Sequence, residues 1–257
     1  MGKPIARRIA RPIARSMPAG GALPWESGGA ALVPQLPLTG MIAGYEFSPA
    51  YVTFGTGAEV ASVSDLSGNG NTLTAVGAGG SRMTAAQSAS YGGQYVLTGT
   101  GTPGLARATW VQGSQSQPLW IACVGETVNV TCIVYDGGAG NFTGPYRYHS
   151  NVTSYQVGAG GTELAGGART KAGLLDQFEV DASGTDRAFR NNWATAAATG
   201  DAGDNAMQGV ALGNHTIIGD FQGVIACWYA YSTMTAARLA QLAAYLNAKF
   251  ATSITGV

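Results

Sequence analysis

The chain is divided into many short β-forming segments by turns rich in glycine, asparagine and serine, and this pattern limits its possible folds most strongly. The segments are rich in Val, Ile, Thr, Tyr and Trp. Many short strands with a turn signal about every 8–12 residues are typical of a β-sandwich or a β-barrel. The expected strands are 41–47, 91–97, 106–112, 119–125, 128–135, 146–149, 154–157, 175–180, 187–190, 208–212 and 221–231.

The composition excludes several other fold classes. Gly and Pro number 39 and 10, whereas charged residues make up only 11% of the chain, against about 25% in an ordinary globular protein. Coiled coils, helical bundles and charged disordered chains do not have this composition. Hydrophobic residues reach 46%, which is enough for a sizeable core. No apolar run approaches the roughly 18 residues that a membrane-spanning helix needs, so we expect no insertion into a membrane.

Two pairs of neighbouring segments are predicted to form β-hairpins. Segment 119–125 is joined to 128–135 by the dipeptide Glu126-Thr127. Segment 178–181 is joined to 187–190 by a turn in which a glycine can take a positive φ. Both pairs should therefore lie side by side in an antiparallel sheet.

The first hairpin would place two of the three cysteines, Cys123 and Cys132, opposite each other. A cross-strand disulfide is geometrically allowed in that register. Assembly in a bacterial cytosol favours thiols instead, and a buried cysteine then behaves as a small hydrophobic residue. The sequence is compatible both with a Cys123–Cys132 disulfide and with two thiols.

One α-helix is predicted near the C-terminus, over Ala236–Phe250, with Thr235 as its N-cap. Tyr245 lies beside an apolar stripe that should pack on the rest of the domain. Arg238 and Lys249 are expected to face water, and Lys249 falls in the last turn, where a cation suits the helix dipole. The stripe consists of Leu239, Leu242, Leu246 and Phe250.

The net charge of the chain is zero because a basic N-terminal segment and an acidic remainder cancel each other. Residues 1–25 contain five basic and no acidic residues, so that they carry +5, and the remainder carries −5. Such asymmetry suggests a basic arm on an acidic domain. We therefore divide the chain into an N-terminal arm and Pro/Gly-rich linker, 1–39, and a domain, 40–257. The residues expected to dock the arm on a partner are Lys3, Arg7, Arg8, Arg11, Arg15 and Trp25.

Several roles are open to this arm. It lacks the apolar stretch of a secretory signal peptide, but an Arg-rich, acid-poor start is also found in mitochondrial transit peptides. It could equally be a passive disordered terminus. We favour an arm that orders on a protein partner, because five charges without interleaved aromatic residues make a thin nucleic-acid footprint.

Three motifs resemble one family. The turn Asp65–Asn71 (DLSGNGN) resembles the turn near the start of concanavalin A-like lectin/glucanase domains, the laminin-G-like jelly rolls. Segment 217–231 is similar to the closing strand of that family, and Leu242–Phe250 is similar to its final short helix. The resemblance covers roughly residues 40–251. It implies an all-β jelly-roll β-sandwich of two antiparallel sheets with a short C-terminal α-helix, here preceded by an extended N-terminal arm.

Such domains behind a short Arg/Pro-rich arm resemble virion proteins of tailed bacteriophages. The expected function is therefore a structural virion protein, either a capsid decoration or a tail or fibre component, that assembles in the bacterial cytoplasm. Its arm would contact other virion proteins, and it would be multimeric in the particle. The first alternative is a carbohydrate-binding module that recognises host surface glycans, and the second is a glycan hydrolase.

The candidate catalytic residues depart from the family pattern. Glycosidases need two carboxylates about 5–10 Å apart. Glu179 and Asp181 share one face of a predicted strand, and Asp176 lies just before them. The glucanase branch of the family uses a Glu-x-Asp-x-x-Glu strand, whose order and last Glu are not matched here. We therefore expect no enzymatic activity and interpret these residues as a solvated strand face that leads into a hairpin.

Two loops contain oxygen ligands of the kind that Ca²⁺ prefers. Some members of the family bind Ca²⁺ at the rim of the sandwich. Aspartate and asparagine beside glycine more often form tight turns through local hydrogen bonds, so we expect no cofactor here. The candidate residues are Asp65, Asn69 and Asn71 in one loop, and Asp201, Asp204 and Asn205 in the other.

A glycan-binding patch is predicted beside a glycine-rich loop, where aromatic rings could stack on a sugar and polar side chains could bind its hydroxyls. The alternative is that these aromatic residues belong to the core or to an interface. The candidate residues are Asp136, Asn141, Tyr146, Tyr148 and Tyr155.

Overall fold

The chain divides into two units, Met1–Leu32 and Val33–Val257. The computed structural model describes residues 34–76, 83–101, 104–107, 118–127, 132–137, 144–149, 154–160, 163–168, 172–178, 186–190, 192–203, 205–213 and 221–257.

One of two sheets carries the C-terminal helix and is called the helix-side sheet. In the described residues it has eight strands, and all their pairings are antiparallel. The 3₁₀ turn η1 (Ala89–Tyr91) lies between two of them. In spatial order the strands are β15 (Asn192–Gly200), β14 (Asp186–Arg190), β13 (Ala172–Phe178), β8 (Leu119–Thr127), β17 (Phe221–Tyr231), β6 (Gln94–Gly101) and β5 (Thr84–Ser88), and β1 (Met41–Glu46) also pairs with β17.

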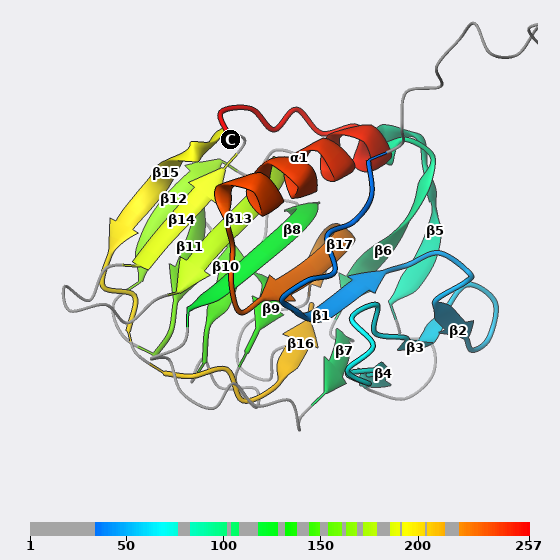
Figure 1. Cartoon of the computed structure of the whole chain (residues 1–257). Coiled ribbons are helices and arrows are strands. Elements are labelled where there is room, and N and C mark those ends of the chain that lie inside the picture. Colours follow the sequence, from blue (N-terminus) through cyan, green and yellow to red (C-terminus); the bar gives the residue numbers. More distant parts are fainter. Residues whose placement is uncertain are drawn as a thin grey trace, which may run out of the picture. The chain divides into compact units, whose positions relative to one another are not determined.

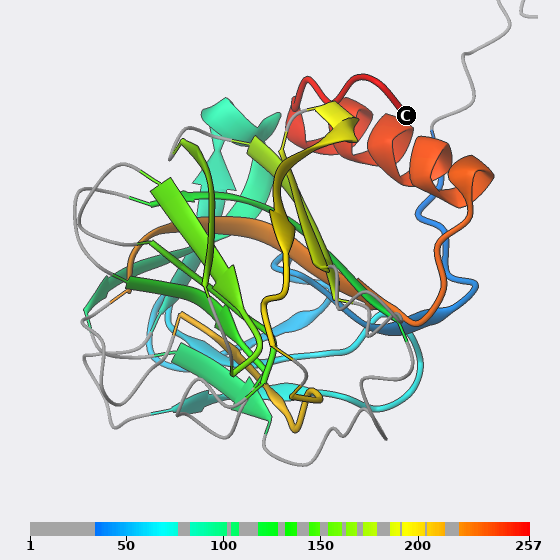
Figure 2. The ribbon, with the colours of Figure 1, turned by 90° about the vertical axis from the view of Figure 1, so that its left-hand side faces the viewer.

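The second sheet is called the far sheet, because it lies on the opposite side from the helix (Figure 2). Nine strands form it in the part of the chain that the structure describes, again with antiparallel pairings. In spatial order they are β12 (Leu164–Ala168), β11 (Ser154–Gly158), β10 (Tyr146–His149), β9 (Cys132–Asp136), β16 (Val210–Leu212), β7 (Gly104–Arg107), β4 (Leu73–Val76), β3 (Val60–Val63) and β2 (Val52–Phe54).

The described residues form two apolar cores, one on each face of the helix-side sheet. Figure 1 shows α1 lying along one of these faces. The inner core lies between the two sheets and contains Tyr45, Tyr135 and Trp228. The outer core lies between the helix-side sheet and α1 (Ala236–Phe250) and contains Trp193. The prediction of an all-β jelly-roll sandwich with two antiparallel sheets and a short C-terminal helix is confirmed.

Strand β17 supplies side chains to both cores. Phe221 and Ile225 point into the inner core, whereas Cys227 lies in the outer core and Trp228 lies in the inner core again. A register irregularity between Ile225 and Cys227 explains this change, because one extra residue shifts the alternation of faces. Tyr229 consequently faces the helix rather than the far sheet.

Helix α1 agrees with the sequence prediction in its bounds and in its cap. The Thr235 side chain accepts a hydrogen bond from the backbone N–H of Arg238 at 3.2 Å. Leu242, Leu246 and Phe250 are buried against the sheet. In the described part of the chain, no helix combines the length and the apolar character needed to cross a bilayer.

The sequence analysis missed β2, β3, β4, β5, β12 and β15. Several of these strands are built from small residues, as in β12 (LAGGA) and β15 (NWATAAATG). Ala and Gly are depleted in strands, so local propensity indicates nothing at these positions. The strands form because neighbouring strands offer them backbone hydrogen bonds.

Of the two predicted hairpins, one is confirmed as an antiparallel pair of neighbouring strands and one is wrong. Strands β13 and β14 do pair antiparallel, but residues 187–190 lie opposite 174–177 instead of the predicted segment 178–181, of which residues 179–181 lie outside the described residues. Strands β8 and β9 do not pair, because β8 belongs to the helix-side sheet and β9 to the far sheet. The connection between them passes from one sheet to the other. Cys123 is accordingly opposite Leu174 and Trp228 in register instead of Cys132, and it remains a thiol.

Replacement of Leu242 by aspartate should release α1 from the sheet. The Leu242 side chain is fully buried in the outer core, so the change removes apolar contacts and buries a charge, at a cost of about 3–5 kcal/mol. Thermal melting measures the effect. Ala244→Asp on the exposed face of the same helix is the control, expected within about 0.5 kcal/mol of wild type. Equal melting temperatures for Leu242→Asp and wild type would refute the packing.

Candidate functional site

A buried carboxylate connects β1 to α1. Glu46 is the last residue of β1, and only 4% of its surface is exposed. The neighbouring Tyr45 points into the inner core, so alternation directs Glu46 toward the helix. A charge in such surroundings requires hydrogen-bond partners, and three side chains provide them.

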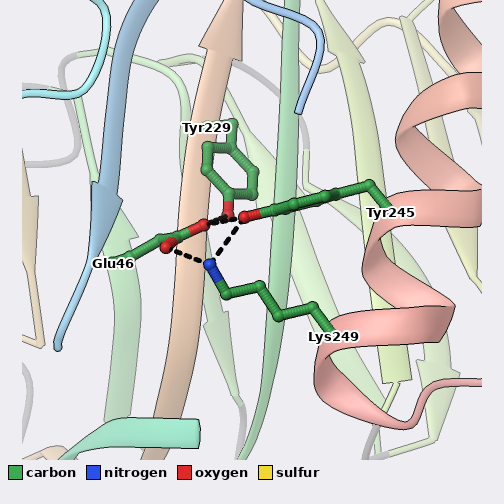
Figure 3. A network of polar contacts seen from close by, with 4 residues as sticks. All are labelled: Glu46, Tyr229, Tyr245 and Lys249. Carbon is green, nitrogen blue, oxygen red and sulfur yellow. Dashed lines mark hydrogen bonds and ion pairs between the residues drawn. The ribbon is translucent and has the colours of Figure 1, made fainter. Parts of the chain in front are cut away.

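Two tyrosines and one lysine donate to this carboxylate (Figure 3). The hydroxyl of Tyr229 donates to Oε1 of Glu46 at 2.6 Å, and the hydroxyl of Tyr245 donates to the same oxygen. Nζ of Lys249 donates to Oε2 at 2.5 Å and to the Tyr245 hydroxyl at 2.7 Å. Tyr245 and Lys249 are four residues apart and share one face of α1. These four residues are called the Glu46 network.

Burial keeps both tyrosines of the network protonated. It is the largest cause that raises the pKa of Tyr229 well above the ordinary value, and electrostatic interactions with the Cys227 side chain and with the Glu46 carboxylate add to the effect. Burial likewise raises the pKa of Tyr245, and the Glu46 charge raises it further. Both hydroxyls are therefore hydrogen-bond donors at neutral pH.

The Glu46 network opens on a surface hollow of about 440 Å³. Leu38 and Tyr51 present the most exposed apolar surface of its lining, with exposed fractions of 58% and 37%. The apolar and aromatic residues of the lining are Leu36, Leu38, Tyr51 and Leu66. The polar ones are Gln35, Glu46, Asp65, Tyr245 and Lys249.

One wall of the hollow belongs to the segment that the sequence analysis assigned to the linker. The Tyr231 hydroxyl donates to the carbonyl of Pro37 at 3.0 Å, and the Gln241 amide donates to the carbonyl of Gln35 at 3.1 Å. Leu36 packs against the outer core. Residues 35–38 are thus held on the domain by backbone contacts.

Asp65, a residue considered for Ca²⁺, also lines the hollow and is held by several hydrogen bonds. Its Oδ1 accepts hydrogen bonds from the backbone N–H groups of Gly44 and Ser67, at 3.0 and 2.9 Å. Its Oδ2 accepts from the Ser67 hydroxyl at 2.6 Å and from the Asn71 N–H at 3.0 Å. The carboxylate therefore closes the turn and fastens it to β1.

The two asparagines of this turn have a similar role. Nδ2 of Asn69 and Nδ2 of Asn71 donate to the carbonyl of Ile42, at 2.9 and 3.0 Å. Gly68 and Gly70 take positive φ values of 81° and 74°, which only glycine adopts at little cost. The turn that resembles the lectin family thus has a structural use here.

In the second candidate Ca²⁺ loop, the Asp201 side chain accepts a hydrogen bond from the backbone N–H of Gly203, and Asp204 lies outside the described residues. Among the residues that the structure describes, no three His, Cys, Asp or Glu side chains gather as a metal site would require.

The predicted glycan patch is not assembled as expected. Strands β9, β10 and β11 do lie side by side, so the segments meet. However, Asp136 and Tyr155 are completely buried, and Tyr155 belongs to the inner core. These two side chains are unavailable to a surface glycan, because the far sheet turns them inward. Tyr146 and Tyr148 lie on β10 without described side chains, and Asn141 lies outside the described residues.

Of the candidate catalytic and arm residues, only Asp176 lies among the described residues. Asp176 is buried between the sheets, where its Oδ2 accepts a hydrogen bond from the Tyr135 hydroxyl at 2.7 Å, so it is not on a solvated face. Glu179 and Asp181 lie outside the described residues, as do the arm residues Lys3, Arg7, Arg8, Arg11, Arg15 and Trp25.

Sequence reasoning missed the central residues of this site. Glu46, Tyr51 and Tyr229 were not candidates. Lys249 was expected to face water, and its side chain is still 28% exposed, but its pairing with Glu46 was not foreseen. The signal that was available is the i, i+4 spacing of Tyr245 and Lys249 on one helix face. Nothing in the sequence connected them to Glu46, which is about two hundred residues away.

No family model and no curated protein sequence matches the chain. Solved structures do share its fold. Domain 4 of AbnA, an extracellular GH43 arabinanase from Geobacillus stearothermophilus, solved with arabinotriose, has a TM-score of 0.53 and 16% identity over 79% of this chain and 97% of that one. The binding domain of botulinum neurotoxin DC in complex with SialylT has a TM-score of 0.50 and 9% identity over 79% and 50%. Trypanosoma rangeli sialidase in complex with the inhibitor DANA has a TM-score of 0.51 and 9% identity over 83% and 33%.

These likenesses concern the fold alone, because the identities are low. The chain spans nearly all of the arabinanase domain, but only half of the toxin chain and a third of the sialidase chain. The domain therefore has a lectin-like β-sandwich fold. Lectins, hydrolases and inert spacers share such folds, so the fold alone does not determine the function.

The raised pKa values predict a loss of stability in alkali. An unfolded tyrosine releases its proton near pH 10, whereas folded Tyr229 and Tyr245 retain theirs. Their contribution is complete below about pH 10 and is lost as the pH rises further. Chemical unfolding from about pH 7 to 11 should show this fall, and Tyr245→Phe, with one fewer such group, should show a shallower one. Tyr51→Phe is the control and should parallel wild type. Parallel curves for Tyr245→Phe and wild type would contradict this assignment.

Proposed function

We propose that this domain binds carbohydrate and that the hollow beside the Glu46 network is its binding site. The observation behind the proposal is the combination, in one hollow, of an exposed aromatic ring and fixed polar groups. Its volume of about 440 Å³ lies within the usual range for small-ligand sites. The β-sandwich that it shares with an arabinose-oligosaccharide complex and with a sialidase supports this choice.

The lining suits the amphipathic surface of a sugar. A sugar ring offers C–H faces and a rim of hydroxyl groups. Tyr51 and Leu38 offer apolar surface to such a face, because their side chains are exposed. Tyr245 and Lys249 contribute polar atoms to the same lining. The two kinds of surface would act on the same ring.

The groups in the hollow are held in place before a ligand arrives. The Tyr51 backbone N–H donates to the Ser48 carbonyl at 2.9 Å, and the Tyr51 carbonyl accepts from the Ser64 N–H at 2.8 Å. Lys249 is fixed by its contacts to Glu46 and Tyr245. Such preorganisation lowers the entropy cost of binding.

The proposal is for binding without hydrolysis. A glycosidase needs one carboxyl as acid and another as base or nucleophile. Asp65 accepts four hydrogen bonds that close a turn, and Glu46 accepts three from the network. Carboxylates held in this way stabilise the fold and are poorly placed to attack a sugar.

A second proposal concerns residues 1–25, which contain five basic and no acidic residues and so carry a charge of +5. We propose that this segment docks the domain on a protein partner. A structural role in a bacteriophage virion is one form of this proposal. The solved structures named above are an arabinanase domain, a toxin binding domain and a sialidase. They support the carbohydrate-binding proposal more than the virion role.

A glycan array tests the binding site. Wild-type protein should bind a subset of glycans, and Tyr51→Ala should lower that signal about two- to tenfold, because a contact with an aromatic ring contributes on the order of 0.5–1.5 kcal/mol. Val76→Ala is the matched control, since Val76 is also 37% exposed but lies on β4, outside the lining. Silence of the wild-type protein on every glycan would reject the proposal.

Deletion of residues 1–25 separates the two proposals. Glycan binding should persist, because the described lining begins at Gln35. Docking on a protein partner should disappear, and co-sedimentation with that partner or particle measures it. A folded deletion variant that loses its array signal would show that the arm contributes to the glycan site.

A further inference from the structure

We propose that the hollow selects uncharged sugars and discriminates against acidic ones such as sialylated glycans. This inference rests on the proposed carbohydrate-binding function and adds the chemical class of the ligand. It follows from the charges in the lining and from the hydrogen-bonding capacity that the fold leaves unused there.

The charges in the hollow disfavour an anionic ligand. Among the described residues of the lining, Glu46 and Asp65 are acidic and Lys249 is basic, a formal sum of −1. The Lys249 ammonium is already paired with Glu46, at 2.5 Å from Oε2. An acidic sugar would therefore meet one compensated cation and two carboxylates, and like charges repel strongly at partly buried sites.

The hydrogen bonds of the three charged side chains in the hollow leave these side chains one donor and one acceptor. An ammonium has three protons and a carboxylate about four acceptor positions. Within the described structure, Lys249 uses two protons, Glu46 uses three positions, and Asp65 uses four. The remaining donor is on Nζ of Lys249 and the remaining acceptor is on Oε2 of Glu46.

This adjacent donor and acceptor match sugar hydroxyl groups. A hydroxyl group can accept from Lys249 and donate to Glu46, either alone or together with the hydroxyl on the next carbon. A ligand carboxylate can accept from Lys249, but it has no proton for Glu46. The Lys249–Glu46 pair therefore stabilises hydroxyl groups by two hydrogen bonds, whereas it would stabilise a carboxylate by one.

The test is an array of matched pairs, each neutral oligosaccharide printed beside its terminally sialylated counterpart, probed with the full chain. Neutral members should give signals about tenfold stronger than their sialylated partners. The neutral signals should change little between about 50 and 500 mM NaCl, since screening affects only charge attraction. Equal or stronger sialylated signals, or signals that fall with salt, would overturn the inference while leaving the glycan site intact. Silence on all pairs would reject the glycan site itself.

Substitutions at Lys249 give a second test, on the neutral oligosaccharide that binds best. Lys249→Gln retains an N–H donor and should keep binding within about threefold, whereas Lys249→Met should lose about tenfold, the value of one hydrogen bond. Equal losses in the two folded variants would show that an N–H donor at this position does not contribute to binding, against the inference. Arg238→Gln, on the same helix but outside this lining, is the matched control. Circular dichroism checks folding, and the wild-type pair comparison does not depend on these variants.

Discussion

Strand β17 is the element on which both cores depend, because both of its edges are paired and both of its faces are buried. Along one edge it pairs with β8, and along the other first with β6 and then with β1. The irregularity after Ile225 shifts the faces, so that Trp228 fills the inner core and Tyr229 points to the helix. Without that shift the alternation would send Tyr229 into the sandwich, and the carboxylate on β1 would lose a donor.

The buried charge of Glu46 links the fold to the hollow. Its burial is tolerated because Tyr229, Tyr245 and Lys249 donate to it, and two of these donors are on α1. The same contacts fix the helix on the sheet and place Lys249 at the hollow. Stability and the proposed recognition thus share residues. The exposed Tyr51 is different, since its ring lies on the surface and can be changed at little cost to the core.

Local patterns predicted elements whose signals are local. The helix Ala236–Phe250 has its cap and apolar stripe within one segment, and the pairing of β13 with β14 joins neighbours in the chain. The supposed hairpin from β8 to β9 failed because a short connection between sheets has the same sequence pattern as a turn within one sheet. The Ala/Gly-rich strands, such as β12, were missed because their pairing comes from neighbours rather than from their own propensity.

The sequence by itself determined the class of fold, the C-terminal helix and the opposite charges of arm and domain, since periodicity, capping and composition act within short stretches. Only the tertiary structure decided the site. It turned Asp136 and Tyr155 inward, used Asp65 to close a turn, and brought Lys249 against Glu46. Which face of a strand is buried and which distant strand pairs with it are collective properties of packing, and no segment contains them alone.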